Sequence, residues 1–156
     1  MLEVKFYDTV DDSLLKFAVI ISQSNGKWVF CKHKERDTFE VPGGHREAGE
    51  NTLETAKREL QEETGAIKFD IKPVCVYSVT GKTRVNDTGE ESFGGLYFAE
   101  ISEFAKELHS EMEKVVLMDE LPDNWTYPLI QPKLIEKYLQ IERQTYSKIQ
   151  LAQSKL

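Results

Sequence analysis

The sequence has no long hydrophobic run. Its longest purely apolar stretch, Phe17–Ile21, is far shorter than the roughly 20 residues that a helix needs to span a bilayer. The first residues do not join a basic region to an apolar one, as a secretory signal would. We therefore expect a soluble cytoplasmic protein with no membrane-spanning segment.

The sequence also has only two cysteines and no excess of basic charge. The two cysteines, Cys31 and Cys75, stand singly in strand-like segments, so neither a zinc site nor a disulfide framework is indicated, and we expect buried thiols. The 27 acidic side chains outnumber the 20 basic ones, for a net charge of −7. This balance disfavours electrostatic binding along an extended nucleic-acid backbone. If the substrate carries phosphates, something else must offset the repulsion.

No repeat, low-complexity tract or Gly/Ser linker interrupts the 156 residues. A chain of this length fits one globular domain, so we predict a single domain over residues 1–156. Hydrophobic content falls near the C-terminus, and we expect about 146–156 to fray.

Turn chemistry marks the first strands. The segments 14–22 and 27–33 are rich in β-branched and aromatic residues, and Asn25-Gly26 between them suits a tight hairpin turn. Thr38–Val41 is a short extended segment. Pro42-Gly43-Gly44 follows it and predicts a loop, because proline cannot donate to a ladder and glycines permit unusual backbone angles.

One helix is predicted over residues 52–64. Asn51 followed three residues later by Glu54 forms a capping-box pattern, and Gly65 supplies a C-terminal stop. Between these signals apolar or small residues recur at helical spacing, namely Leu53, Ala56, Leu60 and Thr64.

Further strands are predicted at 67–80, 92–101 and 115–118. A C-terminal helix is indicated by apolar residues that fall largely on one stripe: Ile130, Leu134, Tyr138, Ile141 and Ile149. Strands interleaved with two main helices predict a mixed α/β layer fold.

The helix over 52–64 carries three carboxylates on one edge. At 100° per residue, Glu59, Glu62 and Glu63 fall within a 100° arc beside the apolar stripe. Like charges at this spacing destabilise a helix by about 0.2–0.5 kcal/mol per pair, and a divalent cation would offset that cost. Hard oxygen ligands suit Mg²⁺, with Mn²⁺ as the alternative. A solvated acidic face is the other interpretation of the three glutamates alone.

The spacing around these glutamates is more specific. Residues 44–66 follow the pattern G-x5-E-x7-R-E-U-x-E-E-x-G-U, where U is apolar. Seven fixed Gly, Glu or Arg positions would coincide at a chosen start by chance on the order of once in 10⁸. This segment resembles the Nudix box, and the chain resembles the Nudix hydrolases. The approach Phe39–Gly44 is most similar to the compact mutator-type nucleoside triphosphate pyrophosphohydrolases.

This resemblance implies a fold and an activity. The fold would be a mixed β-sheet sandwiched between helices (α/β/α), with a loop–helix–loop catalytic motif. The activity would be Mg²⁺-dependent hydrolysis of a nucleoside diphosphate linked to another group. In that chemistry cations neutralise phosphoryl oxygens and activate a water.

The resemblance also assigns roles by position. The metal ligands it implies are Gly43, Glu50, Glu59, Glu62 and Glu63. Arg58 would pair with a carboxylate of the box and orient it, because a guanidinium fork suits bidentate bonding. The general base stays open between Glu59, Glu63 and the loop acids Glu111 and Glu113. We favour Glu63 as a ligand and Glu111 as a loop ligand or base.

Substrate-binding candidates lie outside the box. Lys32 and Arg36, where the chain leaves the second hairpin strand, could bind phosphate. Phe39 could stack on a base, and Asn124 could form a hydrogen bond to a purine edge. Each has a structural alternative: a solvated cation, a core aromatic and a turn residue. His45 stands where mutator-type enzymes often have lysine, which weakens the phosphate contact expected there.

Three functions remain open at this point. The first is hydrolysis of nucleoside triphosphates, oxidised purine nucleotides such as 8-oxo-dGTP among them, to monophosphate and pyrophosphate. The second is removal of pyrophosphate from an RNA 5′-triphosphate end, and the third is a nucleotide-sensing module without catalysis. The downstream Tyr and Pro markers of diadenosine-polyphosphate and ADP-ribose hydrolases are absent. The oligomeric state is not indicated.

Overall fold

The computed structural model describes residues 2–83, 86–106 and 112–155. Its elements in chain order are β1 (Glu3–Tyr7), η1 (Asp12–Leu14), β2 (Leu15–Ser24), β3 (Lys27–His33), β4 (Phe39–Glu40), β5 (Gly43–His45), α1 (Thr52–Thr64), β6 (Ala66–Thr80), β7 (Ser92–Phe104), β8 (Met112–Met118) and α2 (Gln131–Ser154).

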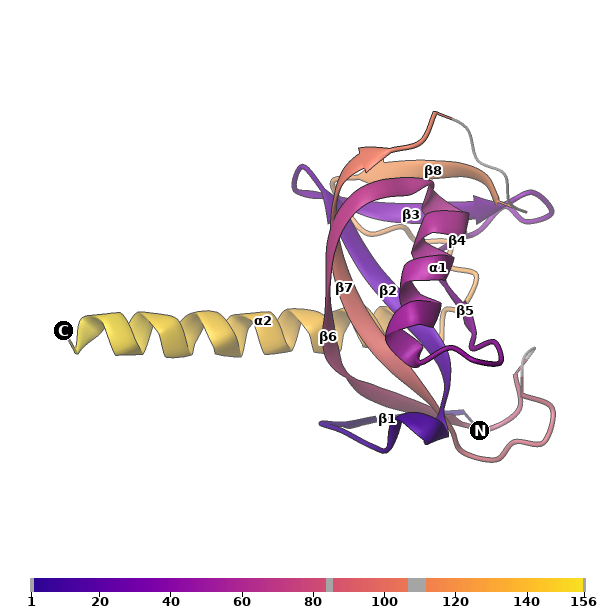
Figure 1. The fold of residues 1–156 in the computed structure, drawn as a ribbon, viewed down its shortest axis with the longest axis horizontal. Helices are drawn as coiled ribbons and strands as arrows, with labels where there is room; N and C mark the ends of the chain where they lie inside the picture. Colours follow the sequence, from indigo (N-terminus) through magenta and orange to yellow (C-terminus); the bar gives the residue numbers. More distant parts are fainter. Residues whose placement is uncertain (1, 84–85, 107–111, 156) are drawn as a thin grey trace.

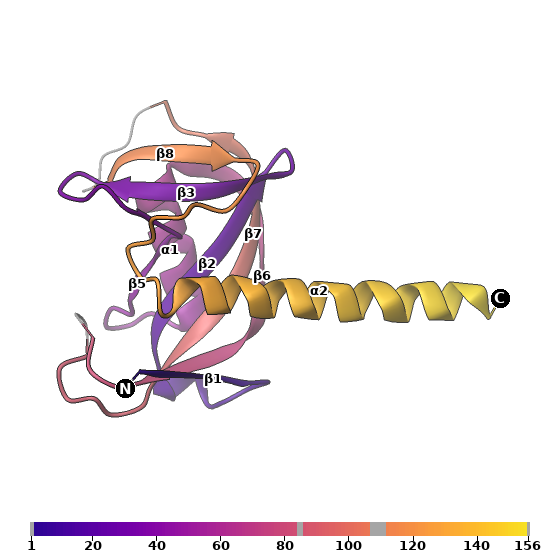
Figure 2. The same ribbon diagram turned by 180° about the vertical axis from the view of Figure 1, so that it is seen from behind.

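Among these described residues, eight strands form one sheet in the order β1-β6-β7-β2-β3-β4, with β5 added on β2 and β8 on β3. β2 and β7 run parallel, and the other pairs are antiparallel, so the sheet is mixed. The helix α1 covers one face and α2 crosses the other, as the two opposite views show (Figures 1 and 2). The predicted α/β fold is confirmed.

Each helix packs on its own hydrophobic cluster. On the α1 side, the fully buried Ala56 and Leu60 meet side chains of β2 and β7. On the α2 side, the buried Leu134, Ile135 and Tyr138 meet the other face of the sheet. Burying a leucine or isoleucine side chain stabilises a fold by about 1.5–3 kcal/mol, so packing contributes strongly to holding both helices.

Several boundaries differ from the sequence prediction. The strand β1 was not predicted, although Val4 and Phe6 alternate there. Gly43–His45, predicted as a loop, pairs as β5 with Phe17–Val19 of β2. A glycine pair carries no strand pattern of its own, so this pairing comes from the tertiary structure. β7 also runs on to Phe104, and β8 begins at Met112.

The helix α2 continues beyond the sheet. Figures 1 and 2 show its C-terminal half extending away from the rest of the molecule, and every described residue from Arg143 onward is exposed. In the structure the helix continues to Ser154, and the fraying expected over 146–156 stays a prediction. No helix of the described residues is long and apolar enough to cross a membrane.

The predicted helix over 52–64 is confirmed as α1, with both of its terminal signals in place. The Asn51 side chain accepts from the Glu54 backbone N–H at 2.9 Å, and the Asn51 N–H donates to the Glu54 carboxylate at 3.1 Å. Gly65 ends the helix with a left-handed φ of 74°. The capping box fixes where the acidic helix begins.

Replacing the capping side chain tests this start. Asn51→Ala removes the acceptor of one helix N–H and should lower the free energy of unfolding by about 1 kcal/mol in urea denaturation. Asn51→Asp keeps an acceptor and serves as the control. Equal losses in both variants would show that the cap does not set the stability of α1.

Candidate active site

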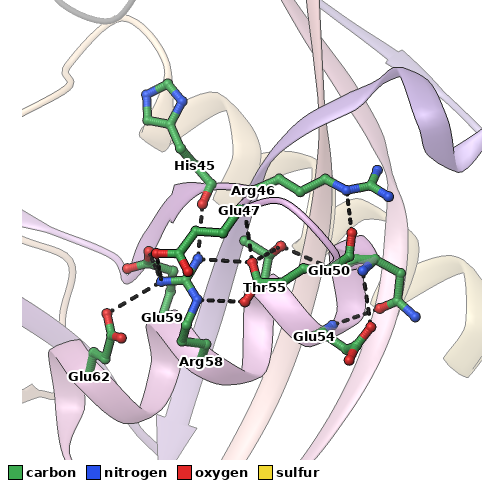
Figure 3. A network of polar contacts seen from close by, with 10 residues as sticks. His45, Arg46, Glu47, Glu50, Glu54, Thr55, Arg58, Glu59 and Glu62 are labelled. Atoms are coloured by element: carbon green, nitrogen blue, oxygen red, sulfur yellow. Dashed lines mark hydrogen bonds and ion pairs between the residues drawn. The ribbon is translucent and has the colours of Figure 1, made fainter.

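A single guanidinium lies at the centre of the acidic cluster (Figure 3). Arg58 Nε donates to Glu50 Oε2 at 2.6 Å, and Arg58 Nη2 donates to Glu50 Oε1 at 3.1 Å. Arg58 Nη1 lies 2.8 Å from Glu59 Oε1 and 3.4 Å from Glu62 Oε2. Arg58 Nη2 also donates to the His45 carbonyl at 3.0 Å. Arg58 thus links β5, the following loop and two turns of α1.

Glu50 is the residue that Arg58 binds through both carboxylate oxygens. The carboxylate of Glu50 also accepts from the Thr55 hydroxyl at 2.9 Å and from the Glu47 N–H at 3.0 Å. The hydrogen bonds from Arg58, more than the other contacts, lower the pKa of Glu50 to about 2. Glu50 is therefore ionised at neutral pH and fixes the loop before α1.

Glu59 has a different environment. Its side chain is only 14% exposed, and burial raises its pKa while Arg58 opposes that shift. A Cβ atom built on Gly44 would overlap the Glu59 carboxylate, so a side chain at residue 44 would have to displace that carboxylate. The buried carboxylate and the glycine backbone are thereby packed against each other.

Glu63 fixes the other end of β5. This buried residue accepts from the Gly43 N–H at 2.7 Å through Oε1. Its backbone carbonyl meets the thiol of the buried Cys31 at 3.5 Å. Cys31 is a buried free thiol, as expected, and Cys75 is a partly buried one.

The donors of α1 fit a hard divalent cation by their chemistry. Glu59, Glu62 and Glu63 offer only carboxylate oxygens, and two of the three are shielded from water. Within the described part of the chain, no three acidic, His or Cys side chains converge as a ready cluster. Glu59 and Glu62 instead face Arg58, which offsets part of their repulsion.

A cavity of about 130 Å³ adjoins β5 on the α2 side. Its walls come from β2, β5, β6 and the segment before α2, and they are largely apolar and aromatic. They include Phe17, Val19, Glu40, Val41, Gly43, Gly44, His45, Tyr77, Tyr127, Ile130 and Gln131. Gly43 and Gly44 belong both to this wall and to the strand that contacts Glu59 and Glu63. The cavity and the carboxylates therefore share β5.

The predicted substrate residues are not in the cavity wall. Phe39 packs with the cluster under α2, and its backbone bonds the segment after β8. Asn124 donates its side-chain amide to the Asp37 carbonyl at 2.6 Å, as a turn residue does. Lys32 lies 4.0 Å from Asp37, and Arg36 lies 3.4 Å from Glu40, which does line the cavity.

The predicted loop acid Glu111 lies outside the described residues, and so does the side chain of Glu113. Sequence reasoning also missed most of the cavity wall. No sequence pattern marked Tyr127 as a cavity residue, because it is a single aromatic residue in the connection between β8 and α2. Gln131 was passed over too, although it is buried and accepts from the Val41 N–H at 3.0 Å. His45 is exposed at the end of β5, and the centroid of its ring lies 4.6 Å from that of the Phe17 ring.

This loop–helix–loop with its arginine-bound glutamates, set on a mixed sheet, defines a hydrolase acting on pyrophosphate bonds. A family model of the NUDIX domain matches residues 13–138, so the chain belongs to the NUDIX family. Members of this family generally use divalent metals.

Individual relatives agree with this family assignment. The chain is 34% identical over 123 residues to "Putative 8-oxo-dGTP diphosphatase YtkD" of Bacillus subtilis (strain 168), a match that covers 78% of this chain and 73% of the relative. The crystal structure of a mutant of the Bacillus subtilis pyrophosphohydrolase BsRppH matches with a TM-score of 0.71 at 28% identity, covering 89% of this chain and 90% of that one.

A more distant structure shares the fold. The NUDIX hydrolase from Nitrosomonas europaea matches with a TM-score of 0.62 at 20% identity, over 80% of this chain and 88% of that one.

The low pKa of Glu50 gives a pH-dependent prediction. Because its pKa falls from 4.5 to about 2 on folding, its ionised form stabilises the protein above pH about 4.5. That contribution is lost as the pH falls towards about 2. Urea unfolding should therefore show Glu50→Gln less stable than the parent at pH 6, with the difference shrinking between pH 4.5 and 2.

The matched control is Glu103→Gln, which removes a surface carboxylate that lies 3.2 Å from Lys68. Its effect should be small at every pH. A Glu50→Gln difference that does not change with pH would contradict the role of ionised Glu50.

Proposed function

We propose that this chain hydrolyses nucleoside triphosphates, oxidised purine nucleotides such as 8-oxo-dGTP among them, to a monophosphate and pyrophosphate. The observation that carries the proposal is the shared strand β5, which has the acidic helix on one side and an apolar, aromatic cavity on the other. A base held in the cavity would place its phosphates near the carboxylates. The name of the Bacillus subtilis relative, a putative 8-oxo-dGTP diphosphatase, supports the same substrate class.

Mg²⁺ is the proposed cofactor, with Mn²⁺ as a substitute. Oxygen donors from Gly43, Glu50, Glu59, Glu62 and Glu63 would hold it. When bound, the metal would neutralise phosphoryl oxygens and lower the pKa of a water nucleophile.

The part of Arg58 would be to orient Glu50 and Glu59, which it already holds. Glu63, fixed by the Gly43 N–H, would keep one oxygen directed at the site. The proton of the attacking water would pass to Glu59, Glu63, Glu111 or Glu113, with Glu111 favoured as the loop acid.

The aromatic rings of the cavity are the proposed contacts for the base. Phe17 and His45 form an edge-on pair at one wall, and Tyr127 lies in the wall contributed by the segment before α2. Flat aromatic side chains stack on any base at low entropic cost. Lys32 and Arg36 remain proposed phosphate contacts, and the cytoplasmic location remains a prediction.

Removal of pyrophosphate from an RNA 5′-triphosphate end is the second candidate. The structural relative at 28% identity, BsRppH, is named a pyrophosphohydrolase. That name covers removal of pyrophosphate from other triphosphates as well as from free nucleotides. Only a few basic side chains near the site would be needed to hold the RNA end, and Lys32 and Arg36 would be two of them.

A substrate panel separates these functions. The protein with Mg²⁺ is given 8-oxo-dGTP, the normal nucleoside triphosphates and a 5′-triphosphate RNA, and the products are identified. We expect monophosphate and pyrophosphate, fastest from an oxidised purine nucleotide, no turnover with chelator, and recovery with Mg²⁺ or Mn²⁺. A preference for the RNA favours the second candidate. Nucleotide binding without turnover would identify a sensing module.

The role of the acidic helix is tested by one isosteric change. Glu63→Gln removes a metal-binding charge but no core contact, so kcat should fall by roughly three orders of magnitude while circular dichroism stays unchanged. Glu54→Gln is the matched control, since it removes a charge from the same helix and glutamine still completes a capping box. Near-normal turnover by Glu63→Gln would remove this metal assignment.

A further inference from the structure

One buried carboxylate lies outside the box. Glu40 is 7% exposed and forms the end of β4. Burying a carboxylate is costly unless a cation or hydrogen bonds compensate it. A carboxylate at this position therefore needs an explanation beyond packing.

The register of the sheet shows which way Glu40 faces. Glu40 lies directly opposite Cys31 in the antiparallel pair of β3 and β4. Side chains of directly opposed residues project from the same face of a sheet. The Cys31 thiol meets the backbone carbonyl of Glu63 at 3.5 Å, so this face is the one that carries the C-terminal end of α1. Glu40 therefore points towards the end of the acidic helix.

The electrostatics of Cys31 agree with this placement. Burial raises the pKa of the Cys31 thiol well above its ordinary value, and the charges of Glu63 and Glu40 raise it further. Both carboxylates act on the same thiol, one from α1 and the other from β4. Glu40 also contributes to the wall of the cavity, so it lies between the two halves of the proposed site.

A cation next to Glu40 compensates its charge. Arg36 Nη1 donates to Glu40 Oε1 at 3.4 Å, and the two side chains are 32% and 10% exposed. A guanidinium has five N–H donors in a rigid fork, and this contact uses one of them. Arg36 itself comes from the short connection between β3 and β4, where its backbone N–H bonds the His33 carbonyl at 3.1 Å. Glu40 is thus the contact that orients the outer end of Arg36.

We propose that Glu40 is a positioning residue that holds the Arg36 guanidinium beside the C-terminal end of α1, where Arg36 binds a phosphate group of the substrate. The inference rests on the proposed function, since it takes the substrate to be a polyphosphate. Arginine suits this task because its fork can bond a carboxylate and a phosphate oxygen at once. The base would stay with the aromatic wall.

Three variants test the pair: Glu40→Gln, Arg36→Gln and the double variant. Each is measured for KM and kcat on the best substrate of the panel, for inhibition by inorganic pyrophosphate, and for calorimetric binding of a non-cleavable α,β-methylene nucleoside triphosphate. Either single change should weaken nucleotide and pyrophosphate binding about tenfold, with kcat within about twofold. The double variant should bind no more weakly than Arg36→Gln.

The melting temperature separates positioning from a structural role. Glu40→Gln leaves the Arg36 guanidinium partly exposed to water and removes a buried charge, so the melting temperature should stay close to that of the parent while binding weakens. Glu35→Gln is the matched control, because it removes an exposed carboxylate from the same connection and should bind as the parent does. Arg36→Lys keeps the charge without the fork and should give an intermediate affinity.

Three results would overturn the inference: unchanged binding by Glu40→Gln, additive losses in the double variant, or a loss confined to kcat. Failure of the proposed function is distinguishable from these, because it would appear as no nucleotide turnover by the parent protein or as full activity of Glu63→Gln. The calorimetric measurement does not depend on turnover and still reports on Arg36.

Discussion

The site depends on one guanidinium placed among carboxylates that would otherwise repel each other. Arg58 bonds Glu50 with two nitrogens and reaches Glu59 and Glu62 from the same group. These partners come from the loop before α1 and from α1 itself, so one side chain sets the geometry of both. Lysine, a point charge on a flexible stem, could not hold two carboxylates in fixed directions in this way. The loop–helix–loop is therefore a unit organised around Arg58.

The second constraint is the short strand β5, which separates the carboxylates from the cavity. On the α1 side, Glu63 accepts from the Gly43 N–H and Glu59 lies against Gly44. On the α2 side, the same two glycines form part of the cavity wall. A Cβ atom on Gly44 would overlap the Glu59 carboxylate, and one on Gly43 would lie 2.7 Å from the Ala18 carbonyl oxygen of β2. A ligand in the cavity, as proposed, would therefore be separated from the acidic helix by a single layer of backbone.

How much could be predicted from the sequence follows from how local each signal is. The bounds of α1 came from Asn51, Glu54 and Gly65, because caps act within one turn of the helix. The cavity wall brings together Phe17 and Tyr127, which lie more than 100 positions apart, and no local pattern reports such a meeting. The contact of Asn124 could not be predicted for the same reason: the Asp37 carbonyl that accepts its side-chain amide comes from a distant segment.

The distribution of charge explains why a cation should be needed at all. The chain has a net charge of −7, and the acidic helix adds its carboxylates where phosphates would have to lie. The basic side chains proposed as phosphate contacts already face acids, Arg36 with Glu40 and Lys32 with Asp37. Arg58 faces the carboxylates of the box itself. Protein charge alone therefore leaves little positive potential for a polyphosphate, and divalent cations held by the glutamates would supply it.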